Sequence, residues 1–153
     1  MLINRLAQAF RNEGASFAVV GGFAVALHGA VRGTVDVDIV LRFSRKDFVA
    51  AEKALNSLGL TSRLPVDAGQ VFDFREDFIK NRNLVAWSFH NPSNPAEIVD
   101  VIITHDAGKM KIDRIKSGRD VIPIASRRDL IAMKKQSGRP QDLEDVKALE
   151  ELG

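Results

Sequence analysis

Residues 19–41 read VVGGFAVALHGAVRGTVDVDIVL and contain the pattern that decides the fold. A short apolar run enters two glycines, Gly21 and Gly22, and a compact apolar segment at residues 23–28 follows, closed by Gly29. A second apolar run, residues 34–43, carries aspartates at alternate positions. Periodicity and glycine punctuation together predict a strand over residues 16–20, a short helix over 23–28 and a second strand over 34–43.

The two aspartates of the second strand are predicted to share one face. Side chains alternate along a strand, so Asp36 and Asp38 project together while Val37 and Ile39 point to the other side. Two like charges held close together are unfavourable unless a cation joins them. Carboxylate oxygens in this arrangement suit Mg²⁺, although two solvated aspartates on an exposed sheet face would show the same pattern.

Gly21 and Gly22 stand where the first strand enters the helix. Backbone N–H groups at a helix N-terminus suit a phosphate, whereas a tight turn that needs a positive φ would equally call for glycine. No Gly-Lys-Ser or Gly-Lys-Thr sequence follows, so this is not a Walker A loop. The three-glycine spacing of a dinucleotide fingerprint is also missing.

A third carboxylate lies in a later apolar run, EIVDVII at residues 97–103. Asp100 stands in the middle of that run with apolar neighbours on both sides. Because a buried carboxylate without a partner is costly, Asp100 is expected to have a partner or to bind a metal.

The rest of the chain supplies helices and further strands. Ser44 followed by Asp47 is a capping-box pattern that opens a helix ending near residue 57. Pro123 cannot donate a ladder hydrogen bond, so residues 121–125 are predicted to form an edge strand. The other predicted elements are a helix at 2–10, a short helix near 75–80, a hairpin of 84–90 with 97–103, and two helices within 126–152. This order predicts an α/β or α+β fold with a mixed central sheet flanked by helices.

Length and composition exclude several classes of protein. The chain has 153 residues, which favours a single domain over residues 1–153, with a core at about 15–105 and C-terminal helices at about 126–152. It contains no cysteine, which excludes disulfides, zinc–thiolate sites and a thiol nucleophile. The most apolar run, residues 17–27, is shorter than the roughly 20 residues of a membrane-spanning helix. These features predict a cytoplasmic protein without a membrane partner.

Positive charge is concentrated in one segment although the net charge is only +2. Residues 109–139 contain ten Lys and Arg against three Asp. Two interpretations of this segment stay open: its charges lie on solvated helix faces, or they form an anion-binding wall for phosphates or nucleic acid.

Taken together, Gly21-Gly22, Asp36-Val37-Asp38 and Asp100 resemble the nucleotidyltransferase superfamily with the polymerase-β-like fold. Residues 21–41 look especially like small stand-alone members related to AbiEii-type toxins. The C-terminal stretch DLIAMKKQSGRPQDLEDV, residues 129–146, is similar to the helical motif of those members. Residues 44–96 carry no recognisable motif of that family.

The resemblance implies a role for each matching position. Asp36 and Asp38 would hold one Mg²⁺ on the nucleoside triphosphate, and Asp38 with Asp100 would hold a second that activates the acceptor hydroxyl. The implied nucleotide contacts come from the backbone of Gly21 and Gly22 and from the side chains of Lys134 and Arg139, with Asp142 in support. Gly22 stands where many relatives place Ser, which removes one hydroxyl from the phosphate contacts.

The implied function is Mg²⁺-dependent transfer of an NMP from an NTP to a hydroxyl on RNA such as tRNA, on a protein or on a small molecule. The basic segment 109–139 favours RNA, and the AbiEii likeness suggests a toxin–antitoxin component. Two alternatives stay open: a catalytically inactive module that senses nucleotide or binds a partner, and an antitoxin or regulatory subunit. Because the chain is small, a homodimer or a partner protein is expected to complete the acceptor site.

Overall fold

Two short strands at the middle of the sheet, β1 (Ala18–Val20) and β2 (Val37–Leu41), carry the sequence pattern that decides the fold. The computed structural model describes residues 1–30 and 36–152, so residues 34 and 35 of the predicted second strand lie outside the described residues. β1 pairs antiparallel with β2, β2 pairs parallel with β5 (Asn94–Asp106), and β1 pairs parallel with β7 (Asp120–Ala125). The sheet is therefore mixed, as predicted.

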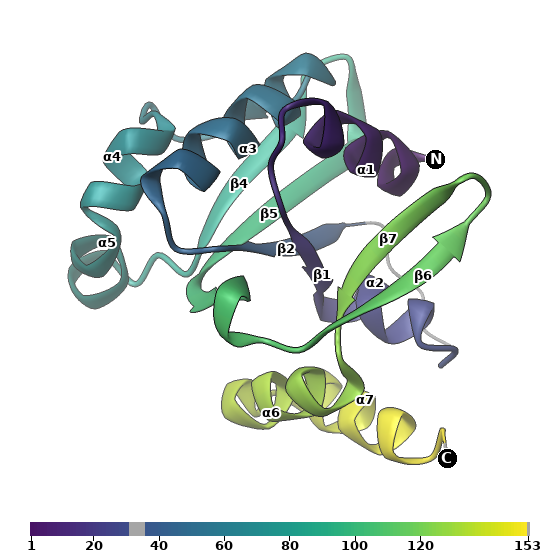
Figure 1. Cartoon of the computed structure of the whole chain (residues 1–153). Helices are drawn as coiled ribbons and strands as arrows, with labels where there is room; N and C mark the ends of the chain where they lie inside the picture. The colour runs from purple at the N-terminus through teal and green to yellow at the C-terminus, as the bar shows by residue number, and fades with distance from the viewer. Residues whose placement is uncertain (31–35, 153) are drawn as a thin grey trace.

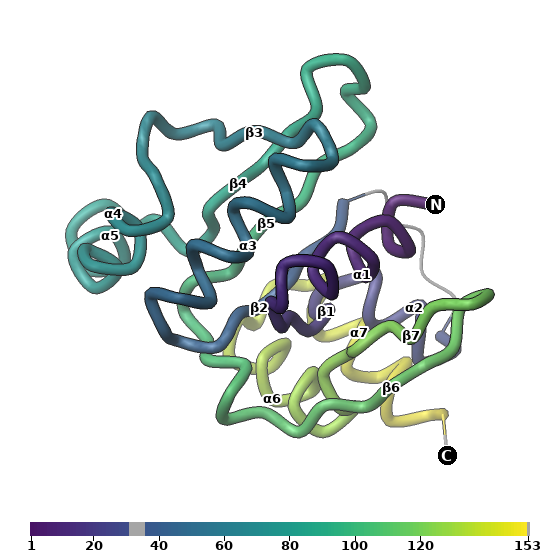
Figure 2. Tube along the Cα trace, turned by 45° about the horizontal axis from the view of Figure 1, so that its top comes forward, coloured from purple at the N-terminus to yellow at the C-terminus, as the bar shows by residue number. Residues whose placement is uncertain are grey.

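Within the described residues the sheet has seven strands in the order β3-β4-β5-β2-β1-β7-β6. The remaining strands are β3 (Thr61–Ser62), β4 (Ala86–Asn91) and β6 (Ile112–Ser117), and β3 and β6 form the two edges. The helices are α1 (Leu2–Asn12), α2 (Gly21–Leu27), α3 (Arg45–Ser57), α4 (Ala68–Asp73), α5 (Arg75–Arg82), α6 (Arg127–Ser137) and α7 (Pro140–Glu150), with a 3₁₀ turn at Ala107–Lys109. α1 and α3 lie on one side of the sheet, and α6 and α7 lie on the other (Figures 1 and 2).

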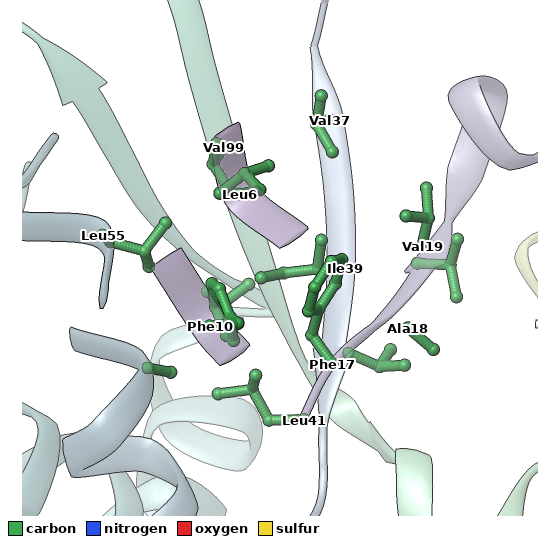
Figure 3. Close-up of a cluster of buried hydrophobic side chains, with 14 of the residues drawn as sticks. Leu6, Phe10, Phe17, Ala18, Val19, Val37, Ile39, Leu41, Leu55 and Val99 are labelled. Carbon is green, nitrogen blue, oxygen red and sulfur yellow. The ribbon is translucent and has the colours of Figure 1, made fainter. Parts of the chain in front are cut away.

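The main hydrophobic core fills the space between the sheet and α1 with α3. Leu6 and Phe10 of α1 lie against Ile39 of β2 and Val99 of β5 (Figure 3). Each of these four side chains is buried. Because side chains alternate along a strand, the residues of β2 and β5 next to these core residues point to the side of the sheet where α6 and α7 lie. The core thus fixes which face of the sheet carries the polar residues.

Local signals explain several helix boundaries. Ser44 accepts a hydrogen bond from the Asp47 backbone N–H at 3.0 Å, so the predicted cap of α3 is confirmed. α6 ends at Gly138, which adopts a left-handed conformation with φ of 67°, and Pro140 opens α7. The chain therefore turns sharply between α6 and α7, which brings the two helices together.

The prediction of an edge strand at residues 121–125 is wrong. β6, which the sequence did not suggest, pairs antiparallel with β7 and takes the edge. β1 pairs with β7 at Val19 and Ile124, one residue beyond Pro123. The missing N–H of Pro123 therefore does not prevent β7 from lying inside the sheet.

The observed architecture confirms the predicted fold class, a mixed sheet flanked by helices. None of the helices in residues 1–30 and 36–152 is long and apolar enough to span a membrane.

Candidate functional site

Asp38 and Asp100 lie side by side on neighbouring strands. They are register partners in the parallel pair of β2 and β5, so both carboxylates project from the same face of the sheet. Both line a cavity of about 450 Å³ between the sheet and the helices α6 and α7. The structure therefore brings together two of the three acids that the sequence singled out.

Burial and repulsion act together on Asp38. Desolvation is the larger effect, and with the negative charge of Asp100 it raises the pKa of Asp38 from 3.8 to about 6. Lys134 opposes this rise and Asp36 adds to it. A cation bound between the carboxylates would relieve the repulsion, so the electrostatics of the pair favour a positively charged ligand.

Asp36 lies immediately before β2 and is half-buried. Its charge acts on Asp38, yet over residues 1–30 and 36–152 no three His, Cys, Asp or Glu side chains are grouped closely enough to hold a metal ion. The pair of Asp38 and Asp100 is thus the centre of the site, and metal binding by Asp36 stays a prediction.

Ser88 is a site residue that the sequence did not reveal. It lies opposite Asp100 in the antiparallel pair of β4 and β5, and its hydroxyl donates a 2.5 Å hydrogen bond to Oδ1 of Asp100. This bond fixes the orientation of the carboxylate. The hairpin at residues 84–90 and 97–103 was predicted, but its register decides which residue faces Asp100, and that register is not visible in the sequence.

Gly21 places backbone directly against the carboxylate of Asp38. Val20 is the register partner of Asp38, and Gly21 follows with a φ of +69° as the first residue of α2. A Cβ on Gly21 would collide with Oδ2 of Asp38. Glycine is therefore required here both by the conformation and by the close approach. Gly22 is buried inside α2 and does not line the cavity.

Lys134 joins α6 to α7 at the edge of the cavity. Its side chain is only 9% exposed, and its Nζ lies 3.2 Å from Asp142 Oδ1 and 2.9 Å from Asp145 Oδ2. Lys134 thus fills a structural position in addition to lining the cavity. Asp145 was not predicted, although its spacing of three residues from Asp142 places both on one face of a helix.

Arg139 and Asp142 lie next to this ion pair. Arg139 Nε donates to Asp142 Oδ2 at 2.8 Å, and the Arg139 backbone N–H donates to the same oxygen at 3.2 Å. The hydrogen bond from Arg139 is the main cause that lowers the pKa of Asp142 from 3.8 to about 2, with Lys134 contributing. Asp142 is buried while the Arg139 side chain stays 73% exposed at the mouth of the cavity. The carboxylate therefore anchors two cations beside the Asp38–Asp100 pair.

Several other residues that line the cavity are neutral. They include Val85, which is 53% exposed, together with Ile102 and Met133. His105 also lines it, with Nδ1 2.9 Å from Thr104 Oγ1 and Nε2 3.1 Å from Gln136 Oε1. Of the ten cations in the basic segment, only Lys134 and Arg139 line this cavity within the part of the chain that the structure describes. The basic segment therefore does not form a continuous wall around the site.

The chain matches known proteins in structure but not in sequence. No family model matches the chain, and no curated protein matches its sequence. Solved structures do match. ANT(2")-Ia in complex with adenylyl-2"-tobramycin is 14% identical and has a TM-score of 0.62, with 99% of this chain and 88% of that chain covered. The lincomycin-bound lincosamide antibiotic adenylyltransferase LnuA is 14% identical with a TM-score of 0.59, covering 95% of this chain and 92% of that one.

A third match is an antigenic nucleotidyltransferase-like protein from Paracoccidioides brasiliensis. It is 15% identical with a TM-score of 0.58, and 97% of this chain and 73% of that chain are covered. At this level of identity the likeness concerns the fold. The chain accordingly has the polymerase-β-like nucleotidyltransferase fold. Within this fold, α2 begins with a glycine and the paired aspartates lie on β2 and β5.

Proposed function

We propose that the protein is a Mg²⁺-dependent nucleotidyltransferase that moves an NMP from an NTP to a hydroxyl group. The observation that carries this proposal is the pairing of Asp38 with Asp100, in register, beside Gly21 and at the wall of one cavity. Matches to structures of adenylyltransferases support the same class of reaction.

The donor set fits magnesium. The pair offers only carboxylate oxygens, and Mg²⁺ is commonly held by one or two carboxylates together with water and substrate phosphates. Asp38 and Asp100 would hold one ion, and Asp36 with Asp38 a second. Such ions neutralise charge on the transferring phosphoryl group and on the acceptor oxygen. Burial and the charge of Asp100 raise the pKa of Asp38, and a bound cation would counter this rise by favouring the ionised form.

The rest of the cavity suits the triphosphate. Gly21 lines the cavity as the first residue of α2, so its backbone N–H lacks an acceptor within the helix. A phosphate contact by the backbone N–H of Gly22, which is buried and does not line the cavity, stays a prediction. Lys134 and Arg139 contribute positive charge, and the exposed guanidinium of Arg139 has room to reach a phosphate oxygen. Asp142 holds both cations in position.

The reaction needs no covalent intermediate on the protein. The acceptor oxygen forms a bond to the α-phosphorus, the bond from that phosphorus to pyrophosphate breaks, and the hydroxyl proton leaves to water. Catalysis of this kind depends on positioning and on charge stabilisation. The chain's contribution is the fixed orientation of Asp100 by Ser88 and of Asp38 between Gly21 and Asp100.

A small hydroxyl compound is the favoured acceptor. The apolar lining residues Val85, Ile102 and Met133 suit an apolar part of such a molecule, while few of the basic residues lie at this cavity. In ANT(2")-Ia the bound product is adenylyl-2"-tobramycin, and LnuA is an adenylyltransferase for lincosamide antibiotics. RNA and protein are the other candidate acceptors. A role in a toxin–antitoxin system related to AbiEii is a further hypothesis. For an RNA or protein acceptor, a homodimer or a partner protein would complete the acceptor site.

Incubation with each α-³²P-labelled NTP and Mg²⁺ tests the proposal. Parallel reactions contain an aminoglycoside, a lincosamide, total tRNA or the protein alone, and label on the acceptor identifies the product. Parent, Asp38→Asn and Asp100→Asn are compared with Asp77→Asn, a control on the exposed surface of α5. Transfer by the parent and control, with loss in the two site variants, supports the proposal. Bound but intact NTP with every acceptor would support the nucleotide-sensing alternative instead.

A further inference from the structure

A second cavity, of about 420 Å³, lies at the other end of β1. The cavity lined by Asp38 and Asp100, called the nucleotide cavity below, reaches β1 at Val20. The second cavity reaches β1 at Ala18 and at the residues that lead into the strand. The two cavities share no lining residue. The second cavity is bounded by α1, the end of β2 and the β6–β7 hairpin.

The charged residues that line this second cavity are all arginines. Arg11 comes from α1, Arg42 follows β2, and Arg114 lies on β6. No acidic side chain is among the described lining residues. Guanidinium groups are always ionised and match carboxylate and phosphate groups with two parallel hydrogen bonds. The cavity is therefore a site of positive charge built from three separate parts of the chain.

Among the described residues, few carboxylates lie close to these arginines. Arg11 is linked to Asp120 at 3.4 Å, but that carboxylate also accepts a hydrogen bond from Asn4 at 3.0 Å. Within residues 1–30 and 36–152, neither Arg42 nor Arg114 has a carboxylate oxygen within 4.0 Å. The positive charge is thus available to a ligand.

Apart from Ser16, the other residues that line the cavity are apolar. Phe10 and Phe17 pack against each other with ring centroids 4.6 Å apart and both border the cavity. Val121, a residue that is 42% exposed, and Pro123 border it from β7. Sites for small molecules commonly combine an apolar lining, a few placed polar groups and a volume of about 300–1,000 Å³. This cavity has all three properties.

We propose that this second cavity binds a small organic anion, a compound with a carboxylate or phosphate group on an aromatic or aliphatic body. The arginines would hold the anionic group, and the phenylalanines with Val121 would cover the apolar body. The lining offers no carboxylate for a magnesium ion, which distinguishes this ligand from Mg²⁺·NTP. The site is independent of the proposed nucleotidyl transfer.

The aromatic anion 1-anilinonaphthalene-8-sulfonate serves as the probe, because its fluorescence rises when it enters an apolar site. The test variant is Arg42→Gln with Arg114→Gln. The matched control is Arg63→Gln with Arg128→Gln, which removes the same charge from exposed residues that line neither cavity. Thermal melts confirm that both variants are folded. Titrations are repeated with saturating ATP and Mg²⁺, and with phenyl phosphate or a glutamate decapeptide as competitors.

We expect the test variant to bind the probe at least tenfold more weakly than the parent, while the control binds it within twofold. Phenyl phosphate should displace the probe, and ATP with Mg²⁺ should not. Equal losses in both variants would show a diffuse charge effect and overturn the proposal. Displacement by ATP would place the probe in the nucleotide cavity, and displacement by the decapeptide alone would indicate a peptide surface; either result also overturns it.

Discussion

Asp38 and Asp100 occupy paired positions on parallel strands, and the burial of Asp38 turns their proximity into an electrostatic conflict. The protein keeps this arrangement although ionisation of Asp38 is opposed by both desolvation and its neighbour. A strained group of this kind is expected where binding of a ligand relieves the strain. The effect of this repulsion on protein stability can therefore be measured without knowledge of the acceptor.

The first prediction concerns Asp38→Asn in the absence of ligand. The folded-state pKa of about 6 lies above the ordinary 3.8, so the folded protein loses stability as the pH rises from about 4 through 6. At pH 8 the variant should be more stable than the parent by about 2 kcal/mol, and at pH 4 the two should be equal. Urea unfolding at both pH values measures this. A variant that is less stable than the parent at pH 8 would show that Asp38 is structural.

Asp142→Asn should behave in the opposite way. The pKa of Asp142 is lowered to about 2, so its ionised form stabilises the protein above pH 4 and that contribution is lost as the pH falls from about 4 to 2. At pH 7 the variant should lose about 2 kcal/mol, the scale of hydrogen bonds to charged groups. The difference between parent and variant should shrink toward zero near pH 2. A stability difference that does not change with pH would show that the charge of Asp142 does not cause it.

Lys134→Met should destabilise the fold apart from any effect on nucleotide binding. The substitution leaves two buried carboxylates, Asp142 and Asp145, without their shared cation, at a cost of about 3 kcal/mol. Lys135→Met is the matched control, because Lys135 is 61% exposed and its link to Glu150 is 3.8 Å long. We expect the control to change the free energy of unfolding by less than ~0.5 kcal/mol. Equal losses in chemical denaturation would contradict the structural role of Lys134.

Gly21→Ala tests the close approach to Asp38. Gly118 is a matched control, since its φ of +63° resembles the +69° of Gly21 but nothing lies within 4 Å of a Cβ at that position. Both substitutions carry the conformational penalty of about 1 kcal/mol, so the difference between them reports the collision with Asp38. We expect Gly21→Ala to lose a further ~1–3 kcal/mol. Thermal melts with Mg²⁺ and ATP should also show a smaller ligand shift for Gly21→Ala than for Gly118→Ala.

The sequence revealed the local chemistry of the site better than its assembly. Alternation placed Asp36 with Asp38, and the apolar run around Asp100 identified a strand, because both signals lie within a few residues. The pairing of Asp38 with Asp100 joins segments about 60 residues apart, and no local pattern specifies its register. The same reason hides the contact between Ser88 and Asp100.

Two other parts of the fold show what local patterns leave out. β6 has charged residues at Asp113, Arg114 and Lys116, so its apolar signal is weak and the strand forms through its pairing with β7. The family resemblance implies that Lys134 contacts phosphate, and the sharp turn at Gly138, which returns α7 beside α6, also gives it two carboxylate partners that the sequence did not indicate. In both cases a tertiary contact decides the outcome.

Calorimetric titration of ATP in the presence and absence of Mg²⁺ tests the central claim most directly, with the parent, Asp38→Asn, Asp100→Asn and the Asp77→Asn control. If the carboxylate pair holds the ion that joins the protein to the triphosphate, Mg²⁺ should strengthen ATP binding by the parent and the control at least tenfold, which is about 1.4 kcal/mol. That gain should vanish in both site variants. Tight ATP binding by the parent that is indifferent to Mg²⁺, or an undiminished gain in Asp38→Asn and Asp100→Asn, would contradict the account.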